Sequence, residues 1–343
     1  MRRHQWNMRL IHTLRATTAV IAVLSTFTST YAAASGAEGR YIDAVTLAPP
    51  VSQALANLGS RTPETVAPKG APPYVCPSGI PRGEADRPDR QSGRQVHVVY
   101  LVAEDFPDER LDTKGVLNCS VRAWSKWFVE QTGGLEWRID TFKPRSGKTS
   151  EVVDITFVPA SVPGAELSTT ASVEAELQRA GLVDPQKLYL AYVAADGGGT
   201  CGRGRYPLAS TGDGGVFGGH GRFAYAYLFG AEGCHGHDFG VPGSPRWIEA
   251  TVMQEMLHSE GVVPLGAPHA CTGIDPMPNH LCTPGLGLTE LAGVGLDPER
   301  VDVMFPFVSV PLSEKVLDRD HDDYFAHSLP LRDLGDSPYL VKR

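Results

Sequence analysis

The stretch VMQEMLHSEGVV, at residues 252–263, belongs to a segment whose two ends carry helix signals. Ser244 and Pro245 are residue types favoured at the N-cap and at the first position of an α-helix. Gly261 is a type favoured immediately after the last helical residue, where the backbone turns left-handed. We therefore predict an α-helix over residues 245–260.

Three polar side chains of this helix form the candidate site. Gln254 and His258 are four residues apart and so project from one face, with Glu255 beside them. Two ligands at this spacing can hold one metal ion, and a carboxylate between them can act as general base toward a metal-activated water. Apolar residues of the same helix are expected to pack in the core: Ile248, Val252, Met256 and Leu257.

The N-terminus has the features of an export signal. Residues 1–15 contain four arginines and no acid, and an apolar run follows that ends in Ala32-Ala33-Ala34. This order is typical of a signal peptide cleaved near residue 34. No later stretch is apolar for long enough to cross a bilayer. We therefore expect an extracellular protein with no membrane attachment after cleavage.

The cysteines indicate disulfides, and the net charge limits the kinds of partner that the protein can bind. All six cysteines follow the predicted cleavage point, and an even number in an exported chain favours disulfides. Their order along the chain suggests three pairs, although other pairings are possible: Cys76 with Cys119, Cys201 with Cys234, and Cys271 with Cys282. The formal net charge is −8 and there is no basic cluster, which argues against nucleic acid as a partner.

Three parts of the chain differ in composition. Residues 1–34 form the signal peptide, 35–94 are a Pro- and Gly-rich extension or propeptide, and 95–343 form the folded domain. Within the domain we expect strands at 96–103, 135–142, 151–159 and 187–195, and helices at 113–131 and 168–181. This order predicts an α/β fold with a mostly parallel sheet packed by helices.

Two segments follow the predicted parallel strands. Residues 197–221 are Gly-rich and too many for a simple connection, so they are functional, disordered or held by a disulfide through Cys201. Residues 222–230, RFAYAYLFG, alternate in character and are predicted to form an antiparallel edge strand. An edge strand has unpaired backbone groups, which can accept a peptide as an added strand.

The order of motifs resembles that of the secreted bacterial zinc metallopeptidases of the metzincin-like kind, from residue 95 to 324. Several motifs carry the resemblance, in this order: a strand–helix–strand start, a Cys-Gly-x-Gly loop at Cys201-Gly202-Arg203-Gly204, and Cys234 ahead of the helix. They continue with Glu255, His258 and Gly261, then Ala267-Pro268-His269, His280 before Cys282, Asp302-Val303-Met304, and His-Asp-Asp-Tyr-Phe at 321–325. The resemblance implies a zincin-like α+β fold with a twisted sheet, an active-site helix and an irregular C-terminal subdomain.

The resemblance also implies a function. The protein would be a monomeric zinc metalloendopeptidase that hydrolyses a peptide or protein substrate. The implied zinc ligands are His258, His280 and Gln254. Glu255 would be the general base, and Met304 would lie in a methionine turn beneath the metal.

The chain departs from the family pattern at the first ligand, where Gln254 stands in place of a His. A neutral amide oxygen is a poorer zinc ligand than an imidazole nitrogen, so zinc affinity should be reduced and hydrolysis impaired. The alternative is an inactive pseudopeptidase that keeps the fold as a peptide- or protein-binding module. The third ligand is His280, or else His269 or a contribution from His235 or His237.

Two polar clusters are further metal candidates. Residues 234–238, CHGHD, are predicted to be a polar loop pinned by a disulfide. Residues 318–323 contain four carboxylates that could hold calcium. They lack the Gly turn and the distal Glu of a helix–loop–helix calcium site, so we predict a solvated acidic loop or one that caps the next helix.

Overall fold

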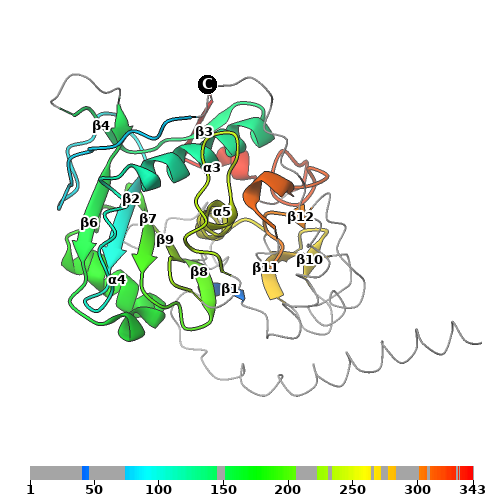
Figure 1. The fold of residues 1–343 in the computed structure, drawn as a ribbon. Helices are drawn as coiled ribbons and strands as arrows, with labels where there is room; N and C mark the ends of the chain where they lie inside the picture. The colour runs from blue at the N-terminus through cyan, green and yellow to red at the C-terminus, as the bar shows by residue number, and fades with distance from the viewer. Residues whose placement is uncertain are drawn as a thin grey trace, which may run out of the picture.

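The chain forms a mixed α/β fold with a mostly parallel sheet, as predicted. In Figure 1, helix α5 lies at the centre, with the sheet on one side and the C-terminal strands on the other. The computed structural model describes residues 41–45, 74–144, 151–205, 222–230, 234–263, 266–271, 277–282, 301–306, 310–329, 331 and 333–342. The predicted signal peptide lies outside these residues.

The main sheet has six strands in the order β1-β8-β9-β7-β2-β6. Their bounds are β1 Tyr41–Val45, β8 Thr200–Arg205, β9 Arg222–Tyr227, β7 Lys187–Ala194, β2 Gln95–Val102 and β6 Ile155–Pro159. Strands β6, β2, β7 and β9 are mutually parallel, whereas β8 and β1 are each antiparallel to their neighbours. One side of the sheet therefore ends in two antiparallel strands.

The central strands owe their position to mostly apolar sequence. Every residue of β2, QVHVVYLV, and of β7, KLYLAYVA, is buried. Strands covered on both faces have this character, because neither face needs polar side chains. The two strands pair in register from Gln95 with Lys187 to Val102 with Ala194.

In the part of the chain that the structure describes, three α-helices cover the sheet, close to their predicted positions. They are α3 Val116–Thr132, α4 Thr170–Arg179 and α5 Trp247–Glu260. Helix α3 ends at Gly133 in the left-handed conformation, and α4 begins after Thr169, whose side chain accepts a hydrogen bond from the backbone of Ser172. The described residues also form three short 3₁₀ helices, Gly164–Ser168, Leu312–Glu314 and Leu334–Asp336.

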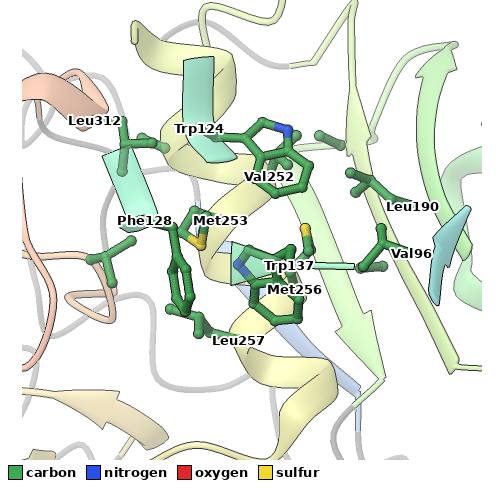
Figure 2. Close-up of a cluster of buried hydrophobic side chains, with 14 of the residues drawn as sticks. Val96, Trp124, Phe128, Trp137, Leu190, Val252, Met253, Met256, Leu257 and Leu312 are labelled. Atoms are coloured by element: carbon green, nitrogen blue, oxygen red, sulfur yellow. The ribbon is translucent and has the colours of Figure 1, made fainter. Parts of the chain in front are cut away.

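The two faces of the sheet bury separate apolar clusters. One cluster lies between the sheet and helices α3 and α5 (Figure 2), where Trp124 and Phe128 of α3 pack with Val252 and Met256 of α5. The other cluster lies on the opposite face and includes Leu177 of α4. Nearly every α5 side chain is buried, which is expected of a helix packed on all sides.

The remaining strands form four two-stranded sheets. These pair β3 Leu135–Trp137 with β14 Leu340–Lys342, β4 Thr141–Phe142 with β5 Val152–Val153, β10 Ala270–Cys271 with β11 Met277–Leu281, and β12 Val301–Asp302 with β13 Lys315–Val316. The predicted strands 135–142 and 151–159 are thus each broken in two. Of these pieces, β6 alone joins the main sheet.

The prediction that residues 222–230 form an edge strand is wrong. Strand β9 lies between β7 and β8, and all of its residues are buried. Small and large side chains alternate along β9. Ala224 and Ala226 belong to the apolar cluster beneath α5, while Tyr225 belongs to the cluster on the other face of the sheet. Both faces are apolar, so the pattern did not mark an exposed side.

The predicted start of α5 is also corrected. Ser244 is not the N-cap, because it forms a tight turn in which its backbone N–H donates to Val241 and its carbonyl accepts from the same residue. The helix begins later, with Arg246 as N-cap.

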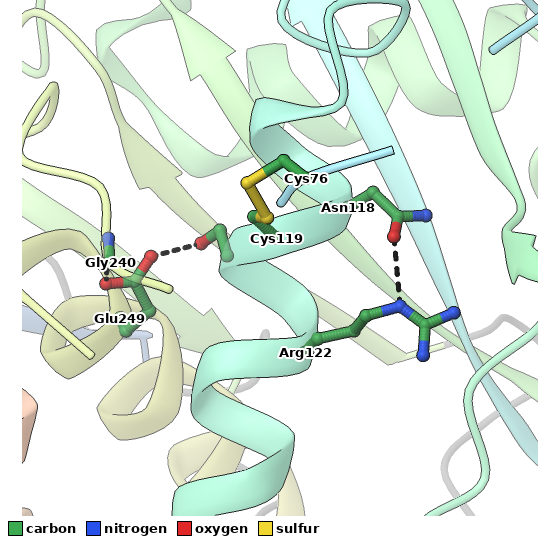
Figure 3. Close-up of a disulfide and its surroundings, with 7 residues drawn as sticks. Cys76, Asn118, Cys119, Arg122, Gly240 and Glu249 are labelled. Atoms are coloured by element: carbon green, nitrogen blue, oxygen red, sulfur yellow. Dashed lines mark hydrogen bonds between the residues drawn. A yellow bond between two sulfur atoms is a disulfide. The ribbon is translucent and has the colours of Figure 1, made fainter. Parts of the chain in front are cut away.

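All three predicted disulfides are present. They join Cys76 to Cys119 (Figure 3), Cys201 to Cys234, and Cys271 to Cys282. Three disulfides fit an extracellular protein, because such bonds persist in oxidising compartments. In the described part of the chain, no helix has the length and apolar character that a membrane span requires.

Candidate functional site

Glycines on β8 allow helix α5 to lie very close to the sheet. A Cβ at Gly204 would lie 2.2 Å from the carbonyl oxygen of Glu255, and one at Gly202 would lie 2.8 Å from the Glu255 Cγ. Both glycines pair with alanines of β9. The motif expected to be a Cys-Gly-x-Gly loop is therefore a strand, and its glycines place Glu255 and His258 on the side of α5 that faces the sheet.

The first turn of α5 is fixed by a buried carboxylate. The Glu249 carboxylate accepts a hydrogen bond from the backbone N–H of Gly240 (Figure 3). It also accepts hydrogen bonds from the backbone N–H of Arg246 and from the hydroxyl of Ser120 on α3. Burial raises the pKa of Glu249 to about 7, against the opposing effect of these hydrogen bonds. This carboxyl joins α3 to the start of α5 and so orients the helix that carries the site.

The structure brings together two residues that the family resemblance implied as zinc ligands, His258 of α5 and His280 of β11. Their Nε2 atoms are 3.2 Å apart, and both side chains are fully buried. Zinc–nitrogen bonds of about 2.0–2.1 Å at a tetrahedral ion separate two ligand nitrogens by roughly 3.3 Å. The pair thus has the spacing of two imidazoles that share an ion, although a hydrogen bond between the rings has a similar length.

His258 is held in its neutral form. Burial lowers its pKa well below the usual value, and the proximity of His280 lowers it further. Its Nδ1 atom is buried and has no hydrogen-bond partner in the described part of the chain. A neutral imidazole can bind a metal, but metal-bound histidines usually donate their second N–H to a carboxylate or carbonyl, and His258 departs from that pattern.

Gln254 is bonded to the turn that contains Met304. Its Nε2 donates a 2.8 Å hydrogen bond to the carbonyl oxygen of Phe305. In the same turn, the Asp302 carboxylate accepts from the N–H of Met304, and the Met304 carbonyl accepts from the N–H of Leu281, next to His280. The turn at 302–305 therefore links α5 to β11, and the Gln254 side chain serves as part of that link.

Glu255 is fully buried beside these residues. Both of its carboxylate oxygens are shielded from solvent. Because Gln254, Glu255, His258 and His280 are all buried, a peptide can reach them only if a covering segment moves.

A third ligand for the histidine pair is not found in the described residues. No Asp, Glu, Cys or further His of that part of the chain brings a ligand atom into a common group with His258 and His280. His269 instead binds Asp323, whose carboxylate accepts from both the backbone N–H and the Nδ1 side of the ring at 2.8 Å. With Asp322, these two residues form a separate group that could hold a metal ion.

The acidic loop at residues 318–323, which was predicted to be solvated, is ordered around one buried carboxylate. Asp318 is fully buried and accepts hydrogen bonds from the backbone N–H groups of residues 322–325. Its oxygens are therefore used within the loop. Nothing in this arrangement identifies calcium.

The CHGHD segment is a polar loop, as predicted. Cys234 is in its disulfide, His235 packs against the ring of Trp247, and His237 lies 3.3 Å from the Glu109 carboxylate. Neither histidine belongs to a metal-ligand group among the described residues.

A third buried histidine, His97, lies in a network that the sequence did not indicate. Asp86, His97, Asp140 and Asp154 place ligand atoms within 4.8 Å of one another, a spacing that could hold a metal ion. However, the Lys187 ammonium already lies 2.7 Å from Asp86 and 2.8 Å from Asp140.

The charges of this network are compensated by the protein itself. Burial alone would raise the pKa of Asp140, but hydrogen bonds from His97 and Lys187 bring it below its usual value. The same carboxylates raise the pKa of Lys187, although burial opposes this effect. Arg87 pairs with Asp154 in turn. We therefore interpret the network as structural, with Lys187 in the place that a cation would take.

Comparisons with family models, with curated proteins and with solved structures found no match for this chain.

Proposed function

We propose that this protein is a secreted, metallopeptidase-like protein that binds a peptide or protein ligand and whose peptide-bond hydrolysis is impaired. One observation carries the proposal. His258 and His280 offer two converging imidazoles, while Gln254, at the first ligand position of the family pattern, donates its amide to the Phe305 carbonyl. Catalytic zinc sites generally use three protein ligands, so a site with two is expected to bind metal weakly.

The histidine pair fits two positions of a zinc site. His258 and His280 would hold the ion through Nε2, and the carbonyl oxygen of the Gln254 side chain is a neutral, weaker donor. The chemistry that zinc supplies when bound is polarisation of the peptide carbonyl. Without a strong third ligand, the fold remains able to bind a peptide while losing much of its capacity for turnover.

A zinc metalloendopeptidase is the second candidate function. It is favoured by the position of Glu255, which lies between Gln254 and His258 in α5, on the side of the helix that faces the sheet. In this role the Glu255 carboxylate would take the proton of the attacking water and return it to the leaving amine. General-base catalysis of this kind typically contributes about 10²–10⁴-fold in rate.

Peptide cleavage and peptide binding distinguish the two candidates. The wild type and Glu255→Gln are incubated with a library of unstructured peptides in the presence of zinc, and products are detected by mass spectrometry. We expect no difference in cleavage between the two proteins and retention of bound peptides by both. Cleavage by the wild type that is lost in Glu255→Gln would establish the endopeptidase and contradict the binding function.

A further inference from the structure

Strand β1 occupies the outer side of β8. It comes from the N-terminal extension, far from the domain in sequence, and yet it pairs antiparallel with β8. The register runs from Tyr41 with Arg205 to Val45 with Thr200, and a shift occurs between Asp43 and Val45. Helix α5 also contacts β1. A segment of the extension thus forms the last strand of the sheet on the side of the candidate site.

The outer side of β8 is the place where an extended peptide would add to this sheet. Sheet edges offer rows of unpaired N–H and C=O groups, and proteins bind extended peptides by adding them as a strand. On β8 the glycines Gly202 and Gly204 lie directly against Glu255 and His258. A peptide paired with β8 would therefore run past the candidate site.

We propose that β1 is an intramolecular strand that closes a peptide-binding edge, and that its release opens β8 to an extended peptide from another chain. This inference deepens the proposed function and rests on it in taking this edge as the peptide-binding position.

The position of the first disulfide makes release of β1 possible by a single cut. Cys76 is bonded to Cys119 of α3, so the part of the extension after residue 76 stays attached to the domain. Strand β1 lies before this bond and is joined to it through residues 46–75. A tethered strand has an effective concentration on the order of millimolar, which is lost when the tether is cut. Cleavage anywhere in 46–75 would convert β1 into a separate, dilutable peptide.

The experiment compares cut and uncut protein. A recognition sequence for a site-specific protease is inserted after residue 55 of the chain that begins at residue 35, in a Glu255→Gln background. Binding of a fluorescein-labelled peptide with the sequence of residues 39–47, GRYIDAVTL, is measured by fluorescence anisotropy before cleavage and after cleavage with dialysis. We expect at least tenfold tighter binding after cleavage, and no such gain for a scrambled peptide. Equal affinities before and after cleavage would overturn the proposal.

A second variant tests the pairing without cleavage. Backbone hydrogen bonds alternate along an antiparallel pair, so the double substitution Ile42→Pro and Asp43→Pro removes an N–H that faces β8. We expect this uncut protein to bind the labelled peptide more tightly than the matched control Val51→Pro and Ser52→Pro. Equal binding by the two would show that β1 does not close the edge.

The outcomes separate this proposal from the proposed function. Neither binding assay needs zinc or turnover, so β1 release can be demonstrated even if the histidine pair binds no metal. Conversely, a zinc-binding histidine pair together with unchanged peptide affinity on cleavage would refute the role of β1 and leave the metal site intact.

Discussion

Two buried histidines in this protein have opposite surroundings. His97 has a partner at each ring nitrogen: Nδ1 lies 2.9 Å from Asp140, and Nε2 lies 2.9 Å from the Thr156 hydroxyl. His258 faces another imidazole through Nε2, and its Nδ1 has no hydrogen-bond partner in the described part of the chain. Both side chains are fully buried, so burial alone does not distinguish them.

The difference lies in whether the protein completes the site by itself. Around His97 the carboxylates are paired with Lys187 and Arg87, and a buried hydrogen-bonded network of this kind orders a core. At His258 the second imidazole, that of His280, converges on the same point, but no Asp, Glu, Cys or further His of the described residues joins the two as a third ligand. Buried polar groups normally have partners, so an incomplete pair is the better candidate for binding something external.

The largest change in stability should come from removing the ammonium group of Lys187 from the His97 network. Lys187→Met keeps the length of the side chain but leaves Asp140 buried without its ammonium partner. Removing one member of a buried ion pair typically costs about 3–5 kcal/mol. We expect a loss of this size in the free energy of urea-induced unfolding, with zinc affinity unchanged.

Lys126→Met provides the matched control, because Lys126 pairs with Glu130 on the surface of α3. Surface substitutions of this kind usually change stability by no more than about 0.5 kcal/mol. If Lys187→Met cost as little as the control, the interpretation of the His97 network as an internally neutralised site would be wrong.

At the incomplete pair, substitution should change metal binding more than folding. His280→Gln removes one of the two converging imidazoles, and we expect zinc affinity to fall by more than tenfold, or about 1.4 kcal/mol. The measurement is competition for zinc with a chelating indicator dye. The control is His235→Gln, which alters an exposed histidine next to Trp247. Similar zinc affinities for both variants would refute the assignment of His280.

Deleting one hydrogen bond of the His97 network should destabilise the protein less than removing its cation. Thr156→Val removes the hydroxyl and leaves Nε2 of His97 buried without a partner. The expected loss of stability is about 1–3 kcal/mol, measured by urea denaturation. Thr156→Ser retains the hydroxyl, so it should cost clearly less; equal losses in the two variants would show that the bond to His97 does not matter.

The smallest effect concerns the protonation of His258. Its pKa in the folded protein lies well below the value of about 6.5 in unfolded chains, chiefly because of burial. The unfolded state therefore binds a proton below about pH 6.5 that the folded state does not, so stability should fall as the pH decreases through that value. For one histidine the loss is about 0.8 kcal/mol at pH 6.

Comparing metal-free wild type with His258→Gln at pH 6 and pH 7.5 isolates this contribution. The difference in unfolding free energy between the two pH values should be smaller in the variant. An identical difference in both proteins would show that His258 is not held neutral by the fold.

Local signals predicted the elements that depend on local chemistry. Helix α3 ends at Gly133 as expected, and α5 ends at Gly261, because a left-handed residue after a helix favours glycine. The buried strands β2 and β7 were recognisable as continuous apolar runs. The pairing of Cys271 with Cys282 followed from their proximity in the chain.

Features that depend on close packing were misread. The glycines of β8 looked like part of a loop, but they are small because the backbone of α5 passes beside them. The alternation in β9 suggested an exposed edge, yet its small residues face α5 and its aromatic residues face the other core. An alternating sequence indicates that the two faces of a strand have different surroundings. The two faces of β9 differ in the space available for side chains and not in contact with water.

The candidate site was only partly predictable. The family resemblance led to His258 and His280, which the fold brings together. The bond from Gln254 to the Phe305 carbonyl was not foreseen, because it depends on where the turn at 302–305 lies in space. The His97 network was missed because its members are far apart in sequence and form no motif with a characteristic spacing.

The most direct test of this account is the zinc content of the purified, dialysed protein, measured by mass spectrometry of the metal for the wild type and for Gln254→His. A third imidazole should complete the set begun by His258 and His280, so we predict much less than one equivalent of zinc in the wild type and close to one in the variant. A full equivalent in the wild type, or no gain in the variant, would contradict the claim that Gln254 has weakened a zinc site at this position.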